Sequence, residues 1–147
     1  MVTVIIHCSS SKFGNAALIT KWHLSRGWDT IGYHYVILNG WLSAKKYHQY
    51  FDGRIETGRS LDGDSDMEAD EWGAHAKGYN NTVGICLIGE SGKFTRRQMT
   101  KLYDTLFMLK EQYGDIQVRQ HSDVDPINKP HCAGLNKSLV EFLNVEI

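Results

Sequence analysis

Residues 2–7 read VTVIIH, an unbroken run of β-branched residues that ends on a histidine. Short runs of this composition predict strands that are buried on both faces of a sheet. Residues 82–88, TVGICLI, form a second apolar run of the same kind. Helical patterns separate such runs along the chain, and this alternation predicts an α/β fold in layers.

Three segments carry helix signals. Thr95 and Gln98 have the spacing of a capping box, in which each side chain bonds to the other residue's backbone N–H. Gly27 and Gly114 each follow an apolar periodic segment, where glycine commonly ends a helix. The predicted helices span residues 15–26, 95–113 and 137–143.

Further strands are predicted at residues 33–38, 54–57 and 116–119. No helical pattern separates the first two, so we expect them to pair antiparallel, with a turn at Asp52-Gly53. Residues 40–52 are expected to be irregular, and residues 60–71 to form an acidic surface loop. The prediction is therefore a single-domain α/β fold with a central mixed β-sheet flanked by helices.

The composition limits the classes of partner. A length of 147 residues fits one domain, here residues 1–147, and the net charge of −1 provides no basic field for nucleic acid. No apolar run reaches the length of a membrane span, and the first residues lack the basic segment of a signal peptide. Three cysteines, an odd number, argue against a disulfide framework.

Chemistry concentrates at two strand ends. His7 and His121 each come directly after a predicted strand, and residues 121–134 read HSDVDPINKPHCAG. Two histidines with one further ligand and an open fourth position are typical of a catalytic zinc site. The alternative is a pair of exposed loop histidines beside a buried thiol, Cys132. Composition alone leaves both interpretations open.

Five blocks of sequence, read in order, carry a resemblance that covers about residues 2–143. They are IIHCSSS (5–11), WHLSRGWDTIGYHYVI (22–37), DGRIETGR (52–59), GAHAKGYNNTVGICLIG (73–89) and RQHSDVDPINKPHCAG (119–134). The series resembles the zinc N-acetylmuramoyl-L-alanine amidases, a family that includes phage endolysins and peptidoglycan recognition proteins. The resemblance implies hydrolysis of the amide bond between N-acetylmuramic acid and L-alanine in peptidoglycan, in the manner of a phage endolysin.

The resemblance also implies roles for individual residues, with the zinc site at strand ends in an open groove. Three residues match the zinc ligands, His7, His121 and Cys132, and two match catalytic groups, Tyr33 and Lys129. Apart from these matches, His75 is predicted to contact substrate, and so is Asn80 or, alternatively, Asn81.

This sequence departs from the family pattern at the third ligand. The family lysine usually stands two residues before that ligand, and here His131 occupies that position after Lys129. Either His131 binds zinc, or one residue is inserted and Cys132 binds it. We favour Cys132, because thiolate is a strong zinc ligand and the following Ala133-Gly134 fits the family pattern.

A second departure is the aromatic segment 41–51, WLSAKKYHQYF, which lengthens the chain after the strand at 33–38. It is expected either to form a wall of the substrate groove or to be a surface loop with an aromatic plug into the core.

Two rival functions share the same fold. A peptidoglycan-binding module without catalysis lacks the thiol ligand, and a cytosolic muropeptide-recycling amidase usually carries aspartate as third ligand, so Cys132 argues against both. We expect peptidoglycan as partner, no nucleic acid, no membrane insertion and a monomer; a polymerase partner rests on family analogy alone. The protein is expected to be made in the host cytoplasm without a signal peptide and to act on the wall after release.

Overall fold

The computed structural model describes residues 1–147 and places five strands in one sheet, in the order β3-β2-β4-β1-β5. β1 pairs in parallel with β4 and β5, while β2 is parallel to β4 and antiparallel to β3. The predicted mixed sheet is thereby confirmed. The strands are β1 (Val2–Cys8), β2 (Tyr35–Ser43), β3 (Lys46–Thr57), β4 (Val83–Leu87) and β5 (Ile116–Gln120). The helices are α1 (Ala16–Ser25), α2 (Arg96–Tyr113), α3 (His121–Val124) and α4 (Lys137–Glu146), with a 3₁₀ turn at Ala69–Glu71.

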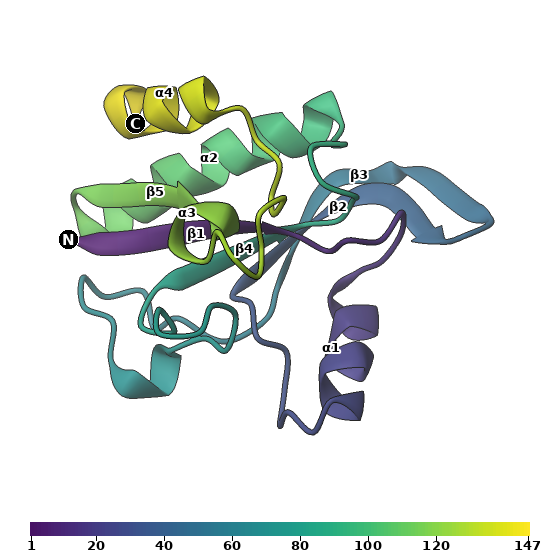
Figure 1. Ribbon diagram of the computed structural model, residues 1–147, viewed down its shortest axis with the longest axis horizontal. Helices are drawn as coiled ribbons and strands as arrows, with labels where there is room; N and C mark the ends of the chain where they lie inside the picture. The colour runs from purple at the N-terminus through teal and green to yellow at the C-terminus, as the bar shows by residue number, and fades with distance from the viewer.

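Helices cover both faces of the sheet. α2 and α4 lie on one face and α1 lies on the other (Figure 1). Side chains alternate along β1, so Val4, Ile6 and Cys8 enter the core beneath α2 and α4. Ile5 and His7 consequently point to the opposite face. The fold thus directs a fully buried histidine out of the larger core, to the side on which α1 lies.

The predicted capping box holds the start of α2. The Thr95 hydroxyl accepts from the Gln98 N–H at 3.1 Å, and the Gln98 side-chain oxygen accepts from the Thr95 N–H at 2.9 Å. The buried Gln98 amide also donates to the carbonyls of Ile37 and Ile88. Because these carbonyls belong to β2 and to the loop after β4, one side chain fixes the helix against the sheet. Gly114 ends the helix, as predicted.

The prediction for residues 40–52 was wrong. β2 continues to Ser43 and β3 begins at Lys46, so the two strands form a long hairpin that projects beyond the sheet (Figure 1). The turn lies at Ala44-Lys45, and Gly53 stands inside β3 with φ +80°. The outer hairpin is largely exposed and its register is interrupted. Because this part of the hairpin has no buried face, its sequence does not alternate between apolar and polar residues and so did not predict strands.

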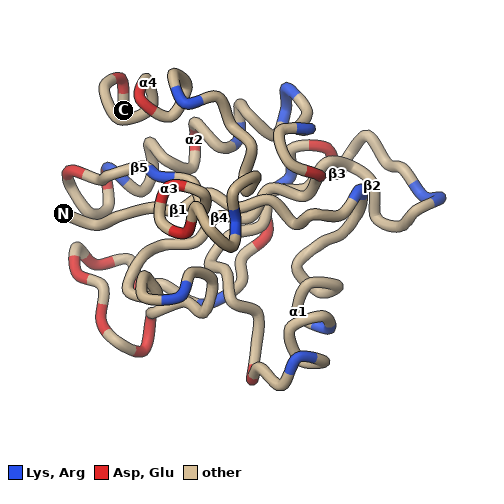
Figure 2. The backbone as a smooth tube through the Cα atoms, viewed as in Figure 1, with Lys and Arg blue, Asp and Glu red and all other residues tan.

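The other predicted elements differ only at their ends. The first helix has Asn15 as N-cap, and the last extends to Glu146. Residues 60–71 do form an acidic loop (Figure 2), although Glu71 at its end is buried. No helix combines the length and apolar character that crossing a bilayer requires.

Candidate metal centre

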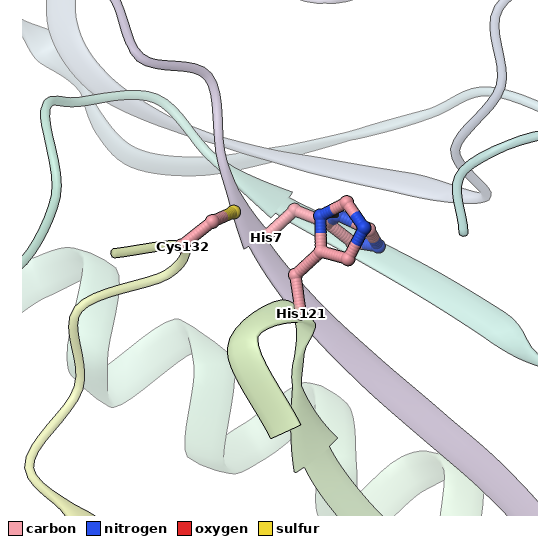
Figure 3. Close-up of side chains that lie close together, drawn as sticks. All are labelled: His7, His121 and Cys132. Carbon is pink, nitrogen blue, oxygen red and sulfur yellow. Dashed lines mark hydrogen bonds between the residues drawn. The ribbon is translucent and has the colours of Figure 1, made fainter. Parts of the chain in front are cut away.

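Three side chains meet beyond the carboxyl ends of the parallel strands β1 and β5 (Figure 3). His7 comes from β1, His121 directly follows β5, and Cys132 lies on the loop after α3. One ligand atom from each residue lies within 4.8 Å of the other two. The Nδ1 atoms of His7 and His121 are 3.0 Å apart. The structure therefore brings together the three residues that the sequence predicted as ligands.

The second ring nitrogen of His7 has a partner that the sequence did not predict. Its Nε2 lies 2.8 Å from Nδ1 of His75, and Nε2 of His75 lies 3.0 Å from the carbonyl oxygen of Thr82. Burial lowers the pKa of both histidines, to about 4 for His75, so both rings are neutral at pH 7.

These contacts determine which nitrogen carries each proton. A carbonyl oxygen only accepts, so Nε2–H of His75 donates to Thr82 and its Nδ1 is unprotonated. His7 must then donate Nε2–H to His75. The Nδ1 of His7 is left unprotonated, with its lone pair directed at Nδ1 of His121, and an unprotonated nitrogen is the form a metal ligand requires.

The structure distinguishes Cys132 from its neighbour. Cys132 is buried, and its Sγ accepts from the Cys8 N–H at 3.2 Å. The Cys8 side chain, followed by burial, raises the pKa of the Cys132 thiol, and the bond from the Cys8 N–H acts in the opposite direction. His131 is exposed, and its carbonyl accepts from the Ser91 hydroxyl. Only Cys132 lies with the two histidines in the cluster.

Comparison with known proteins gives the family. No family model matches the chain. The endolysins of Klebsiella phage KP32 and Escherichia phage T7 are each 34% identical over 134 residues, covering 84% of this chain and 76% of the relative. The N-acetylmuramoyl-L-alanine amidase LysC from Clostridium intestinale URNW superimposes with a TM-score of 0.71 at 26% identity, over 98% of this chain and 83% of LysC.

The chain belongs to the N-acetylmuramoyl-L-alanine amidase family of phage endolysins. The resemblance inferred from the five sequence blocks is thus confirmed, as is the α/β fold.

The two predicted catalytic residues, Tyr33 and Lys129, lie beside the cluster of His7, His121 and Cys132. The Tyr33 ring is 5.0 Å from the His7 ring, between centroids, and burial raises the pKa of its hydroxyl well above the ordinary value. Lys129 is exposed at the rim of a hollow of about 250 Å³ that Cys132 also lines. Burial lowers the pKa of both His7 and His121, and the Lys129 charge acts in the same direction as a smaller cause.

The two residues predicted to contact substrate have structural partners. His75 is only 7% exposed and uses both ring nitrogens internally. It packs on Gly84, where a Cβ atom would lie 2.7 Å from the His75 ring. The Asn80 side-chain oxygen accepts from the N–H groups of His75 and Ala76 and so shapes the loop. Contact of either residue with substrate stays a prediction, and for His75 this burial gives it no support.

Proposed function

We propose that the protein is a zinc amidase that hydrolyses the bond between N-acetylmuramic acid and L-alanine in bacterial peptidoglycan. The observation that carries this proposal is the cluster of His7, His121 and Cys132 in a member of the amidase family. We further propose that residues 1–147 form one catalytic domain, which reaches the wall after release from the cell that makes it.

The donor set fits zinc. Tetrahedral zinc with Zn–N bonds of 2.0–2.1 Å separates two imidazole nitrogens by about 3.3 Å, against 3.0 Å between the Nδ1 atoms here. His7, His121 and Cys132 would hold the ion with two nitrogens and one sulfur, a number of protein ligands typical of catalytic rather than structural zinc sites. Zinc held there supplies a Lewis acid that polarises the scissile carbonyl.

The chain's own residues supply the remaining chemistry in this proposal. Tyr33 is protonated at neutral pH, as any tyrosine is, and burial raises its pKa further, so in this proposal its hydroxyl donates to a substrate oxygen. The Lys129 ammonium stabilises negative charge that develops on the carbonyl oxygen during attack. His75 does not touch substrate in this scheme. It acts as a positioning residue, since it holds the His7 ring in the tautomer with a free Nδ1.

One experiment separates an enzyme from a binding module of the same fold. Metal analysis of the purified protein should give about one zinc per chain. Mass spectrometry of digested cell walls should show free lactyl carboxylates and peptides that begin with L-alanine. Binding to walls without release of these products would overturn the amidase proposal, and absence of metal would overturn its zinc dependence.

A further inference from the structure

A second hollow, of about 520 Å³, lies beside the metal centre and has no part in the proposed chemistry. Its walls come from three places: the β2–β3 hairpin, the loop after β1 and the loop after β4. The side chains that matter here are Lys12, Trp41, Tyr47, Glu90, Lys93 and Phe94. Two of them, Trp41 and Tyr47, belong to the aromatic segment 41–51, which was expected either to form a wall of the substrate groove or to plug into the core.

The aromatic wall is exposed yet held in place. Trp41 is 41% exposed and Tyr47 is 45% exposed, with ring centroids 5.2 Å apart. The Trp41 N–H donates to the Asn39 side chain, and its carbonyl accepts from the Gly14 N–H, both at 3.0 Å. These bonds fix the Trp41 backbone between the hairpin and the loop after β1.

Tyr47 depends on the glycine opposite it. Gly40 has φ +93°, and a Cβ atom at that position would lie 2.6 Å from the Tyr47 ring. The ring thus lies on bare backbone. Phe51 of the same segment does pack against the smaller core, as the plug interpretation expects, whereas the Trp41 and Tyr47 rings are held toward solvent. Exposed apolar surface beside a hollow is a feature of ligand-binding grooves.

The opposite side of the hollow is polar and mainly basic. Lys12 and Lys93 supply two ammonium groups against the single carboxylate of Glu90, which lies 4.0 Å from the Lys12 amine. An aromatic platform facing hydrogen-bonding groups suits a ligand with flat apolar faces and a hydroxylated edge. A pyranose ring has this character, and the lysines complement carboxylates on the attached stem peptides.

The hollow adjoins the metal centre. Ser10 lines the smaller hollow, which Cys132 also lines, and Lys12 lines the aromatic hollow. Because only one residue separates Ser10 from Lys12, their Cα atoms are at most about 7.6 Å apart. On the loop after β4, Ser91 lines the smaller hollow and its neighbour Gly92 lines the aromatic hollow. The Gly92 N–H donates to the Ala133 carbonyl, next to Cys132, at 2.9 Å. A polymer lying at the metal centre can therefore continue into the aromatic hollow.

We propose that the Trp41–Tyr47 wall is a glycan subsite. An N-acetylated aminosugar ring of the peptidoglycan strand stacks on it while a neighbouring muramoyl residue lies at the metal centre. That the polymer is peptidoglycan rests on the proposed function, whereas the inference that the hollow binds a sugar ring rests on the side chains that line it.

The first test is binding of the β-1,4-linked tetramer of N-acetylglucosamine, followed by NMR of the tryptophan indole N–H groups. In the wild-type protein the Trp41 signal should shift, and those of Trp22, Trp28 and Trp72 should not. Trp41→Ala and Tyr47→Ala should each weaken binding about tenfold. Tyr50→Ala is the matched control, because Tyr50 is 71% exposed on the same hairpin but does not line the hollow. An unmoved Trp41 signal would overturn the proposal without any variant.

The second test separates this subsite from the catalytic proposal. Trp41→Ala should cleave purified cell walls about tenfold more slowly than wild type. It should cleave a soluble muramoyl peptide with a single sugar at the wild-type rate. If Trp41→Ala and the wild-type protein cleave cell walls at equal rates, the glycan subsite is overturned. If Trp41→Ala cleaves cell walls more slowly but the wild-type protein does not bind the tetramer, Trp41 and Tyr47 contact the stem peptide instead. A wild-type protein that cleaves neither substrate contradicts the amidase proposal, while the tetramer titration still decides the subsite.

Discussion

His7 Nε2 lies 2.8 Å from His75 Nδ1, and this single contact decides which nitrogen of His7 is free to bind a metal. The chain of bonds ends at the Thr82 carbonyl, which cannot donate, so the direction of every proton along it follows. We therefore propose that His75, in the GAHAKGYN block, acts behind the candidate metal centre, whereas the sequence had predicted it as a substrate contact.

Replacing His75 should therefore weaken zinc binding. His75→Ala leaves His7 free to take either tautomer, and we expect zinc affinity to fall about 10- to 100-fold, measured by competition with a chelator. The imidazole ¹⁵N shifts of His7 should report a mixture of tautomers. His75→Asn keeps an acceptor near the Nδ1 position and should restore much of the affinity.

His34→Ala is the control for loss of a buried imidazole. His34 is as buried as His75, but its ring bonds only to the backbone of Gly84 and Glu71. It should lower the melting temperature and leave zinc affinity near the wild-type value. Equal losses of zinc affinity in the two alanine variants would contradict the positioning role of His75.

Tyr33→Phe tests the hydroxyl alone. The change removes one oxygen and keeps the ring that packs against His7, so zinc content and melting temperature should stay near wild type. Wall cleavage should fall by about 10²–10³ if the hydroxyl serves the transition state. Unchanged cleavage with zinc in place would exclude Tyr33 from catalysis.

Lys129→Ala tests charge at the rim of the site. Lys129 is exposed, so the fold should be unaffected, and cleavage should again fall by about 10²–10³. Lys21→Ala, which removes an exposed lysine from α1, is the matched control and should cleave walls at the wild-type rate. If both variants retain full activity, the proposed role of Lys129 is wrong.

The third ligand can be assigned by two neighbouring substitutions. Cys132→Ser should lose zinc readily, because a neutral hydroxyl is a much poorer ligand than thiolate. His131→Ala should keep zinc, since His131 is exposed and outside the cluster. The reverse result, seen by metal analysis, would move the ligand to His131.

His23 should make stability depend on pH. Its Nδ1 accepts from the Gly32 N–H at 2.9 Å, and burial, followed by the charges of Arg26 and Arg59, lowers its pKa from 6.5 to about 4. Between these values the unfolded chain binds a proton that the folded protein excludes, so stability falls as pH falls through this window. His23→Asn should lose less unfolding free energy than wild type between pH 7 and pH 5, by urea denaturation. Equal losses would contradict this assignment.

Local signals in the sequence predicted much of the fold correctly. The buried runs of β1 and β4, and the Thr95–Gln98 capping box of α2, were recognised because strand burial and helix capping involve residues within a few positions of one another. The exposed hairpin from Trp41 to Phe51 was missed, because strands without a buried face leave no periodic pattern. The ligand set was predicted from the resemblance to a family and not from spacing, since His7 and Cys132 are far apart along the chain.

The sequence by itself determined the α/β class, the main helices and strands, and the set of metal-binding residues to consider. Only the tertiary structure decided that Cys132 and not His131 joins the histidines, that His75 stands behind His7, and that Trp41 and Tyr47 line a hollow beside the metal centre. The physical reason is that backbone periodicity and capping are local, whereas these contacts join segments dozens of residues apart. Strand order and the face to which each side chain points decide them, and both depend on packing across the whole sheet.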